Sequence, residues 1–360
     1  MKAHSIKVLL CILLLHPFLG ISQKTKDAIV INETSALKRP TLFSNLGDTF
    51  GTPDAMAIDK KGNLYLSVPN GSTFEKYGSK ICVFNNLNQP VTWLDNLPLH
   101  PLTNRVHPMG MEFGPDGNLY IADNQNFANK EHQSRLLRVI VENGKPIRTE
   151  VLVQGLNFAN AIRWHKDRIY ISDSALDVKK QSGIYSFKME ELNKGLIQLK
   201  PTDNAPYLIC KFTLKPEAKE WALGVDGIAF DKKGDLYAGN FGDGVISKIE
   251  FSPDGKVKSQ KIIVDSDKLK CCDGLYYYEK TNSIYIANYD NNSVHVLDLN
   301  KNTLSLLWEN GNADGSDGLL DNPCEPIIYK GKLLVVNFDS YKGEKNTEVD
   351  NFHTISSFEL

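Results

Sequence analysis

The segment Asp226-Gly-Ile-Ala-Phe-Asp-Lys-Lys-Gly-Asp-Leu-Tyr decides the fold, because versions of it recur six times along the chain. Each copy has a polar or flexible start, a short apolar strand, a tight turn and a second apolar strand. Most of the turns, Lys-Lys-Gly-Asp among them, supply residues that tolerate the positive φ of a β-hairpin. The copies begin at Asp54, Met109, Asn160, Asp226, Asp273 and Glu325.

The spacing of the copies predicts a ring of β-blades. Successive copies start 55, 51, 66, 47 and 52 residues apart, and further strand-like runs such as Leu136–Val141 and Val245–Ile249 lie between them. Four short antiparallel strands account for most of each interval. Repeats of this length are typical of propeller blades. We therefore predict an all-β, six-bladed β-propeller, with a solenoid of hairpins as the alternative.

The two ends of the chain favour closure of the ring. After the sixth copy, only His353–Leu360 has the pattern of a further strand, which leaves the last blade short. A strand from within Ala28–Leu46 could complete this blade. Such closure removes the exposed edges that an open array would leave. We expect an N-terminal strand to lie in the last blade.

The first residues have the pattern of an export signal. Lys2 and Lys7 precede a largely apolar run, Val8–Leu19, and small residues follow where a signal peptidase would cut. The run is short for a membrane span, although a transmembrane anchor is the alternative. We expect residues 1–22 to be removed as a signal peptide. Residues 23–360 would then form a single propeller that is periplasmic or secreted.

The composition limits the partners that the protein can bind. Of the 360 residues, 41% are hydrophobic and 23% are charged, a balance that can bury a large core. The formal net charge of −2 provides no basic field for nucleic acid or an anionic membrane. We expect a small-molecule substrate, no nucleic acid and no membrane span, and the oligomeric state stays open.

The cysteines suggest one disulfide hypothesis. Five follow residue 22, an odd number, so at least one thiol has no partner within the chain. Cys272 and Cys324 immediately precede two of the copies, so they occupy equivalent positions on adjacent blades. A Cys272–Cys324 or Cys271–Cys324 disulfide is possible in an oxidising compartment. Buried free thiols are the alternative.

The first residue of each copy is expected at one mouth of the central channel, because the first strand of a blade lines that channel. Carboxylates that converge there would repel one another in a low dielectric. Calcium relieves such repulsion and prefers carboxylate and amide oxygens, whereas zinc would require His or Cys in register. We predict one axial calcium ion. Its candidate ligands are Asp54, Asn160, Asp226, Asp273 and Glu325.

A second polar ring follows from the same alignment, at the end of the second strand of each copy. Its side chains would surround the first ring and contact the substrate, or they would satisfy loop backbone groups locally. His107 lies two residues before Met109 and is a candidate general base, with a packed loop histidine as the alternative. The candidate substrate-binding residues are Met109, Asp123, Asp173, Asn240 and Asn288.

One glycine-rich segment has a calcium-binding pattern of another kind. Asn310-Gly-Asn-Ala-Asp-Gly, with Asp321 in the twelfth place, mimics the loop of an EF-hand. The segment lacks flanking helices and the final Glu. We therefore interpret it as an ordinary glycine-rich loop.

The hairpin pattern and the register of Asn160 and Asp226 resemble the senescence-marker-protein/gluconolactonase-like calcium hydrolases, relatives of paraoxonase and diisopropyl-fluorophosphatase, over residues 40–360. The resemblance implies calcium ligation by Asn160 and Asp226, with Asp54 in place of the family's longer Glu. Met109 stands where relatives often place Asn or His to hold substrate.

From this resemblance we expect a calcium-dependent hydrolase of a lactone, ester or phosphotriester. Asp226 would activate water or attack the substrate directly. The alternative is a non-catalytic propeller that binds a ligand or protein partner at the same mouth, with a purely structural calcium ion.

Overall fold

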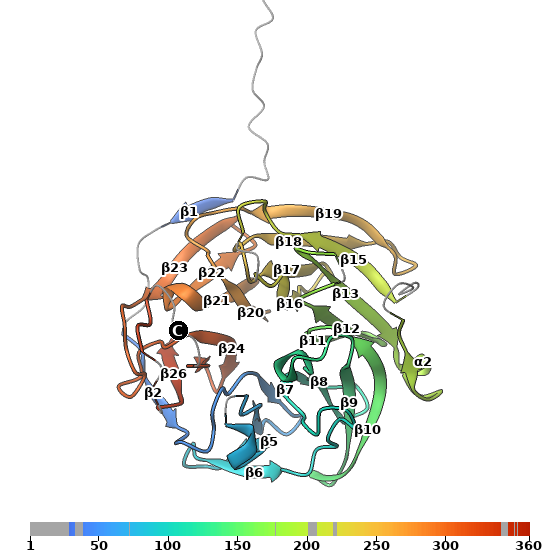
Figure 1. Ribbon diagram of the computed structural model, residues 1–360. Coiled ribbons are helices and arrows are strands. Elements are labelled where there is room, and N and C mark those ends of the chain that lie inside the picture. The colour runs from blue at the N-terminus through green and yellow to red at the C-terminus, as the bar shows by residue number, and fades with distance from the viewer. Residues whose placement is uncertain are drawn as a thin grey trace, which may run out of the picture.

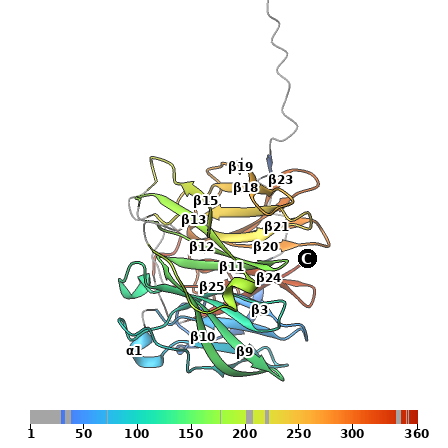
Figure 2. The ribbon, with the colours of Figure 1, turned by 90° about the vertical axis from the view of Figure 1, so that its right-hand side faces the viewer.

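Six β-sheets surround a common axis (Figure 1). The structure is a computed structural model that describes residues 29–32, 39–71, 73–176, 178–200, 207–218, 222–339, 345–348, 350 and 352–360. Figure 2 shows the ring from the side. Each sheet is one blade, so the predicted all-β, six-bladed propeller is confirmed.

Each blade runs from an innermost strand beside the axis to an outermost strand at the rim. Blade 1 contains β3 (Met56–Ile58), β4 (Leu64–Val68), β5 (Lys80–Phe84) and β6 (Pro90–Leu94). Blade 2 contains β7 (Pro108–Phe113), β8 (Leu119–Asp123), β9 (Ser134–Glu142), β10 (Lys145–Leu156) and β14 (Ile197–Gln198). Blade 3 contains β11 (Ala159–His165), β12 (Arg168–Asp173), β13 (Gln181–Lys188) and β15 (Leu208–Thr213).

The second half of the ring repeats this arrangement. Blade 4 contains β16 (Val225–Phe230), β17 (Leu236–Asn240), β18 (Ile246–Phe251) and β19 (Val257–Val264). Blade 5 contains β20 (Cys272–Tyr278), β21 (Ser283–Asn288), β22 (Ser293–Asp298), β23 (Thr303–Glu309) and β1 (Val30–Asn32). Blade 6 contains β24 (Pro323–Tyr329), β25 (Lys332–Asn337), β26 (Thr354–Glu359) and β2 (Thr41–Asn45).

The N-terminal segment closes the ring as expected. Strand β2 pairs antiparallel with β26, with Thr41 opposite Ser357 and Asn45 opposite Thr354. Blade 6 therefore combines three strands from the end of the chain with one from its beginning. The sequence did not predict β1, which adds to the rim of blade 5 parallel to β23.

The repeated hairpins form because their turns satisfy their own backbone groups. In blade 1, Asp59 Oδ1 accepts hydrogen bonds from the N–H groups of Lys61 (2.8 Å) and Asn63 (2.9 Å). Gly62 has a φ of +81°, which glycine adopts without strain. Tyr65 returns a hydroxyl hydrogen bond to Asp59 Oδ2 at 3.3 Å. The Asp, Gly and Tyr of the sequence pattern thus build one hairpin turn.

The core lies between neighbouring blades rather than along the axis. Between blades 1 and 2, the ring of Tyr65 contacts Phe113 edge-on at 5.0 Å between ring centroids. Between blades 6 and 1, Leu64 and Leu66 are fully buried in a cluster that also contains Cys324. Burying such an aliphatic side chain stabilises a fold by about 1.5–3 kcal/mol. The seam that closes the ring is therefore packed as a core.

Helices are few and short in the described part of the chain. They are α1 (Phe74–Tyr77), α2 (Met189–Leu192) and the 3-10 turns η1 (Asn126–Ala128) and η2 (Tyr289–Asn291). Among the described residues, no helix has the length and apolar character needed to cross a membrane. Residues 1–22 lie outside the described residues, so the export signal stays a prediction.

The disulfide hypothesis was wrong, because all five described cysteines are buried free thiols. Cys324 Sγ faces blade 1 and lies 3.2 Å from the carbonyl oxygen of Asp54. Cys272 Sγ faces blade 4 and lies 3.4 Å from the carbonyl oxygen of Gly244. The two side chains therefore point to opposite neighbouring blades. In the strand pairing, Cys272 lies opposite Asn288, whereas Pro323 and not Cys324 lies opposite Asn337. The two cysteines are therefore one position out of register, which keeps their sulfur atoms apart.

Candidate functional site

The six predicted axial residues lie at the starts of the innermost strands. Asp54 precedes β3, and the other five lie within β7, β11, β16, β20 and β24. In these five blades the pairing of the first two strands shifts register at the axial residue, as a β-bulge does. Bulges re-aim a side chain and are common next to functional sites. A local irregularity of the backbone thus repeats around the channel mouth.

The carboxyl groups at the mouth influence one another electrostatically. Burial, followed by the charges of Asp226 and Glu325, raises the pKa of Asp54 well above its ordinary value. Burial and then the charge of Glu325 raise the pKa of Asp226 to about 8. The pKa of Asp273 also rises well above normal, by burial and then the charges of Asp226, Asp54 and Glu325. These four carboxyl groups therefore form one electrostatic unit.

An amide lies within this acidic set. Asn160 Nδ2 donates a hydrogen bond to Asp226 Oδ2 at 2.7 Å, so two of the predicted metal ligands are in direct contact. The carboxylates themselves are more widely spaced. Among the described residues, one group of three carboxylates has an oxygen from each member within 4.8 Å of the others, and its members, Asp321, Asp339 and Asp350, are not axial. An ion at the axis would need the amide as well as the acids.

A buried ion pair that the sequence did not predict lies in the same channel. Arg163 Nη2 donates hydrogen bonds to Glu325 Oε1 (2.6 Å) and to the carbonyl oxygen of Leu275 (2.9 Å). Its charge also lowers the pKa of Glu112, which burial nevertheless raises to about 7. Glu112 and Arg163 each stand three residues after an axial position. That shared register was the available signal, because charged residues are rare in buried strands.

Glu325 differs from the other predicted ligands because it pairs with an arginine, Arg163. Burial raises its pKa, while the charge and hydrogen bond of Arg163 lower it. This carboxylate thus has a cation of the chain beside it. In the described part of the chain, no Lys or Arg forms an ion pair with Asp54, Asp226 or Asp273. The uncompensated charge is therefore concentrated on these three.

Met109 and His107 are both buried near the mouth. Met109 is 3% exposed and packs in a hydrophobic cluster of blades 2 and 3, so its surroundings are those of a core residue. His107 is fully buried, with edge-on ring contacts to Phe74 and Phe127. Its Nδ1 lies 3.0 Å from the carbonyl oxygen of Asn124, and its Nε2 has no hydrogen-bond partner among the described residues.

Burial is the largest influence on His107 and lowers its pKa, which favours the neutral imidazole. A neutral ring with a bare Nε2 can accept a proton. Neither the predicted role of His107 as a base nor a substrate contact of Met109 is tested by these contacts, and both stay predictions.

An aromatic side chain of blade 6 lies against both sides of the mouth region. Phe338 packs on the cluster that contains Met109 and also on the cluster that contains Cys324. Its ring contacts Tyr289 of blade 5 at 6.2 Å between centroids. Tyr289 in turn contacts Phe241 of blade 4 at 5.4 Å. This row of aromatic rings adds an apolar flank to the acidic site.

The second predicted ring supports the loops that lead into the innermost strands. Asp123 Oδ1 accepts the backbone N–H of His107 at 2.8 Å, and Asp123 also pairs with Arg135. Asp173 accepts the backbone N–H groups of Asn157 (2.8 Å) and Phe158 (2.7 Å). These contacts match the local alternative that the sequence left open. A substrate contact by this ring stays a prediction.

Of two further members of this ring, Asn288 also supports a loop and Asn240 does not. Asn288 Oδ1 accepts the backbone N–H groups of Lys270 (3.0 Å) and Cys271 (3.1 Å) just before β20. Asn240 is also buried, but its Oδ1 has no hydrogen-bond partner among the described residues. Asn240 is thus the predicted substrate-binding residue of this ring whose side-chain oxygen is not committed to a loop.

A pocket of about 450 Å³ lies between blades 4 and 5, beside the mouth. Its wall includes Phe241 of the aromatic row and Cys271, which is two residues before the axial Asp273. Charged side chains line it as well, namely Lys215, Glu217, Asp243, Asp267, Lys270 and Asp290. This pocket could not be predicted from sequence patterns, because its walls come from four separate connections.

No protein-family model matches the sequence, and no curated protein matches it. Solved structures do match in fold. A luciferin-regenerating enzyme superposes with a TM-score of 0.59 at 10% identity, covering 89% of this chain and 95% of that chain. A gluconolactonase from Xanthomonas campestris gives 0.55 at 12% identity, covering 91% and 96%. At these identities the likeness concerns the fold alone.

A third structure shows how far this likeness extends. The PQQ-bound aldose sugar dehydrogenase from Streptomyces coelicolor superposes with a TM-score of 0.57 at 14% identity, covering 91% of this chain and 99% of that chain. A gluconolactonase and a dehydrogenase thus share this architecture. The fold that the sequence resemblance implied is confirmed, and the reaction has to be argued from the site.

Proposed function

We propose that this chain is a calcium-dependent hydrolase of a lactone, ester or phosphotriester, with its active site at the channel mouth. The observation that carries the proposal is the set of carboxyl groups of Asp54, Asp226 and Asp273, which influence one another and form no ion pair with a Lys or Arg of the described chain. The likeness in fold to a gluconolactonase supports hydrolysis as the reaction class.

The residues of the mouth fit a hard divalent cation. They offer only carboxylate and amide oxygens, which calcium prefers. Ionising these groups in a buried site is unfavourable, as the raised pKa values of Asp54 and Asp226 record, and a cation would remove that cost. Asp54, Asn160 and Asp226 would hold the ion, with Asp273 beside them. When bound, calcium would supply the charge that polarises a carbonyl or phosphoryl oxygen.

Residues of the chain would provide proton transfer, orientation of the base and contacts to the substrate. Asp226 would accept a proton from the attacking water or attack the substrate itself, and the amide of Asn160 would fix its orientation through their 2.7 Å hydrogen bond. Glu325 would take no part in proton transfer, because Arg163 engages it. The aromatic flank of Phe338 and Tyr289 would favour a substrate with an apolar group.

The test is hydrolysis of a panel of lactones, aryl esters and phosphotriesters, with added calcium and with chelator. Asp226→Asn keeps the shape of the side chain and removes its charge. We expect this variant to lose at least 100-fold in kcat/KM and to bind one calcium ion fewer. Asp254→Asn is the matched control, since Asp254 lies exposed in a distant hairpin. We expect this control to behave as the wild type.

Two results would contradict the proposal in different ways. Calcium binding that depends on Asp226, without turnover of any panel member, would favour a non-catalytic propeller with a structural ion. Turnover that survives both chelation and Asp226→Asn would place the chemistry elsewhere.

A further inference from the structure

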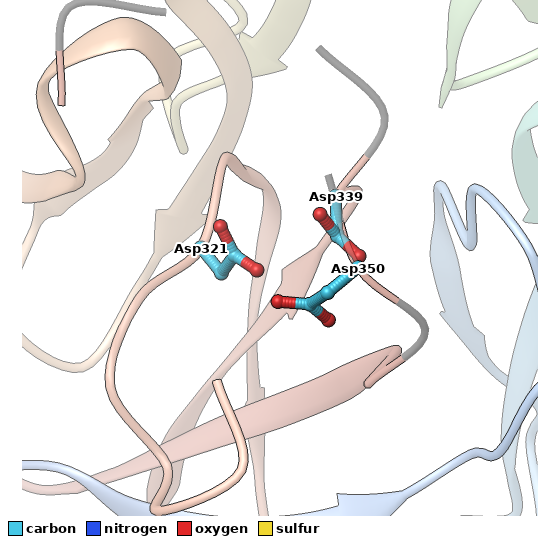
Figure 3. Close-up of side chains that lie close together, drawn as sticks. All are labelled: Asp321, Asp339 and Asp350. Carbon is cyan, nitrogen blue, oxygen red and sulfur yellow. The ribbon is translucent and has the colours of Figure 1, made fainter. Parts of the chain in front are cut away.

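Two loops of blade 6 bring three carboxylates together away from the axis (Figure 3). Asp321 comes from the connection between β23 and β24, whereas Asp339 and Asp350 come from the connection between β25 and β26. One oxygen of each lies within 4.8 Å of the others. Figure 3 shows the three side chains gathered from these two loops around one point.

Two members of this cluster are fully enclosed by protein. Asp321 is 0% exposed and Asp339 is 2% exposed. None of their four carboxylate oxygens accepts a hydrogen bond of ordinary geometry within the described residues, although the backbone of Asp350 lies close enough to Asp339 to lower its pKa. Asp350 is partly exposed and accepts the backbone N–H of Phe352 at 2.8 Å. Buried carboxylates that are neither hydrogen-bonded nor paired with a charge are strongly unfavourable.

No charge of the described chain compensates this cluster. No Lys or Arg within the described ranges forms an ion pair with any of its members. His353 Nδ1 lies 3.6 Å from Asp339 Oδ2, but burial lowers the pKa of this histidine, which favours its neutral form. Asp314, in the same loop as Asp321, adds negative potential. The described residues therefore provide no positive charge to compensate these carboxylates.

We propose that Asp321, Asp339 and Asp350 bind a second hard divalent cation, calcium, in blade 6. Two oxygens that ligate the same calcium ion at about 2.4 Å can be at most about 4.8 Å apart, and the cluster meets this limit. Its donors are oxygens only, which calcium accepts and zinc disfavours. The site stands independently of the proposed hydrolase function, because it shares no residue with the axial set.

The EF-hand pattern around Asp321 does not explain this site. Asn310 Oδ1 accepts the backbone N–H of Leu320 at 3.0 Å, and Asn312 Oδ1 accepts the backbone N–H of Thr347 at 2.8 Å. These side chains therefore organise the loop instead of joining the cluster. The partners of Asp321 come from a different loop, which no local motif could identify.

The second cation would tie together the two loops of the blade that closes the ring. The contact of Asn312 with Thr347 already joins these loops at one point. The connection before β24 leads to the axial Glu325, four residues after Asp321. An ion at the cluster would thus fix the approach to one axial residue and the connection between β25 and β26. This role is structural, so the ion need not touch the substrate.

The test counts calcium ions on the full chain after treatment with chelator, by isothermal titration with calcium alone. Asp339→Asn removes a charge, and Asn suits the positive φ of +43° at this position. Asp321→Asn is the second variant, and it loses no hydrogen bond observed in the described structure. Asp254→Asn is the matched control, because it removes an exposed charge from a hairpin of blade 4, away from the cluster. All four proteins are also melted in chelator and in calcium.

We expect the wild type to bind two calcium ions, each blade 6 variant to bind one, and the control to bind two. In chelator, Asp321→Asn and Asp339→Asn should melt at a higher temperature than the wild type, because they remove repulsion. In calcium this order should reverse. If the variants bind as many ions as the wild type, Asp321 and Asp339 share a proton instead and the proposal is overturned.

The axial variant Asp226→Asn separates the two proposals. If only the axial site exists, this variant binds no calcium while Asp339→Asn still binds one. If only the blade 6 site exists, the two results are exchanged. Each site can therefore fail without the other.

Discussion

Replacing Arg163 by Met should destabilise the propeller more than the loss of an ion pair at the surface would. The side chain of Arg163 is 14% exposed and that of Glu325 is 10% exposed, with 2.6 Å between Nη2 and Oε1. Met fills a similar volume but leaves the carboxylates of Glu325 and Glu112 buried without a cation. Breaking a buried pair by removing one partner costs about 3–5 kcal/mol.

The cost of protonating the unpaired carboxylates sets an upper limit on this loss of stability, and the limit is of similar size. A carboxyl group with an ordinary pKa of about 4.5 can be protonated at pH 7 for about 3 kcal/mol, so each abandoned carboxylate costs at most that much. At pH 5.5 the same limit falls to about 1.4 kcal/mol. The loss of stability in Arg163→Met should therefore shrink by about half or more between pH 7 and pH 5.5. A simple packing defect would not depend on pH in this way.

The assay is urea unfolding in chelator, followed by circular dichroism, at both pH values. Arg148→Met is the matched control, because Arg148 pairs with Glu150 at the surface and is 60% exposed. Such pairs contribute about 0–1 kcal/mol. The double variant Arg163→Met with Glu325→Gln should recover part of the loss. A loss within 1 kcal/mol of the control, or one that is the same at both pH values, would refute the reasoning.

Two further predictions concern packing and protonation. Gly227→Ala should destabilise the protein by about 1–3 kcal/mol in urea unfolding, because its Cβ would lie 2.1 Å from the carbonyl oxygen of Asp273. Gly311→Ala meets nothing within 4 Å and should change stability by less than 0.5 kcal/mol. His295 has its pKa lowered to about 4, chiefly by burial. Its folded pKa lies below the unfolded value of about 6.5, so its contribution is present at neutral pH and is lost as the pH falls from 6.5 to 4. His295→Leu should reduce the loss of stability over this range by about 2–4 kcal/mol in acid titrations of the unfolding free energy, and an unchanged profile would show that this histidine is not responsible.

The sequence predicted the blades because each hairpin carries its own turn chemistry. Asp59 and Gly62 satisfy and shape one turn, and Asp231 and Gly234 do the same in blade 4. Such local interactions need no information from the rest of the chain. Strand β1 was not predicted, because a three-residue strand that pairs parallel at the rim, with Val30 and Ile31 exposed, leaves no periodic pattern.

The predicted axial residues stand at the starts of the innermost strands, but their pairing was not predicted, and in blade 6 Glu325 lies one position later than its counterparts. An ordinary strand alternates its faces, so a residue three positions after an axial one should point away from the channel. The bulge at Asn160 in blade 3 reverses this expectation, and it allows Arg163 to reach Glu325 across the channel. A pattern of period two cannot reveal such a shift. The alignment of Glu112 with Arg163 was visible, but its meaning depends on the backbone irregularity.

Residues that recur in most blades support the fold, whereas residues found in a single blade are candidates for function. The second ring is nearly uniform, with Asp or Asn in five of six blades, and Asp123, Asp173 and Asn288 all accept backbone N–H groups of the loop before the innermost strand. A fold that repeats six times needs the same loop support six times, so uniformity indicates structure. Arg163 occurs in one blade only, and the cluster of Asp321 and Asp339 lies in no common register at all. Features that break the repeat are not required by it, and they are therefore the positions where chemistry specific to this chain is to be sought.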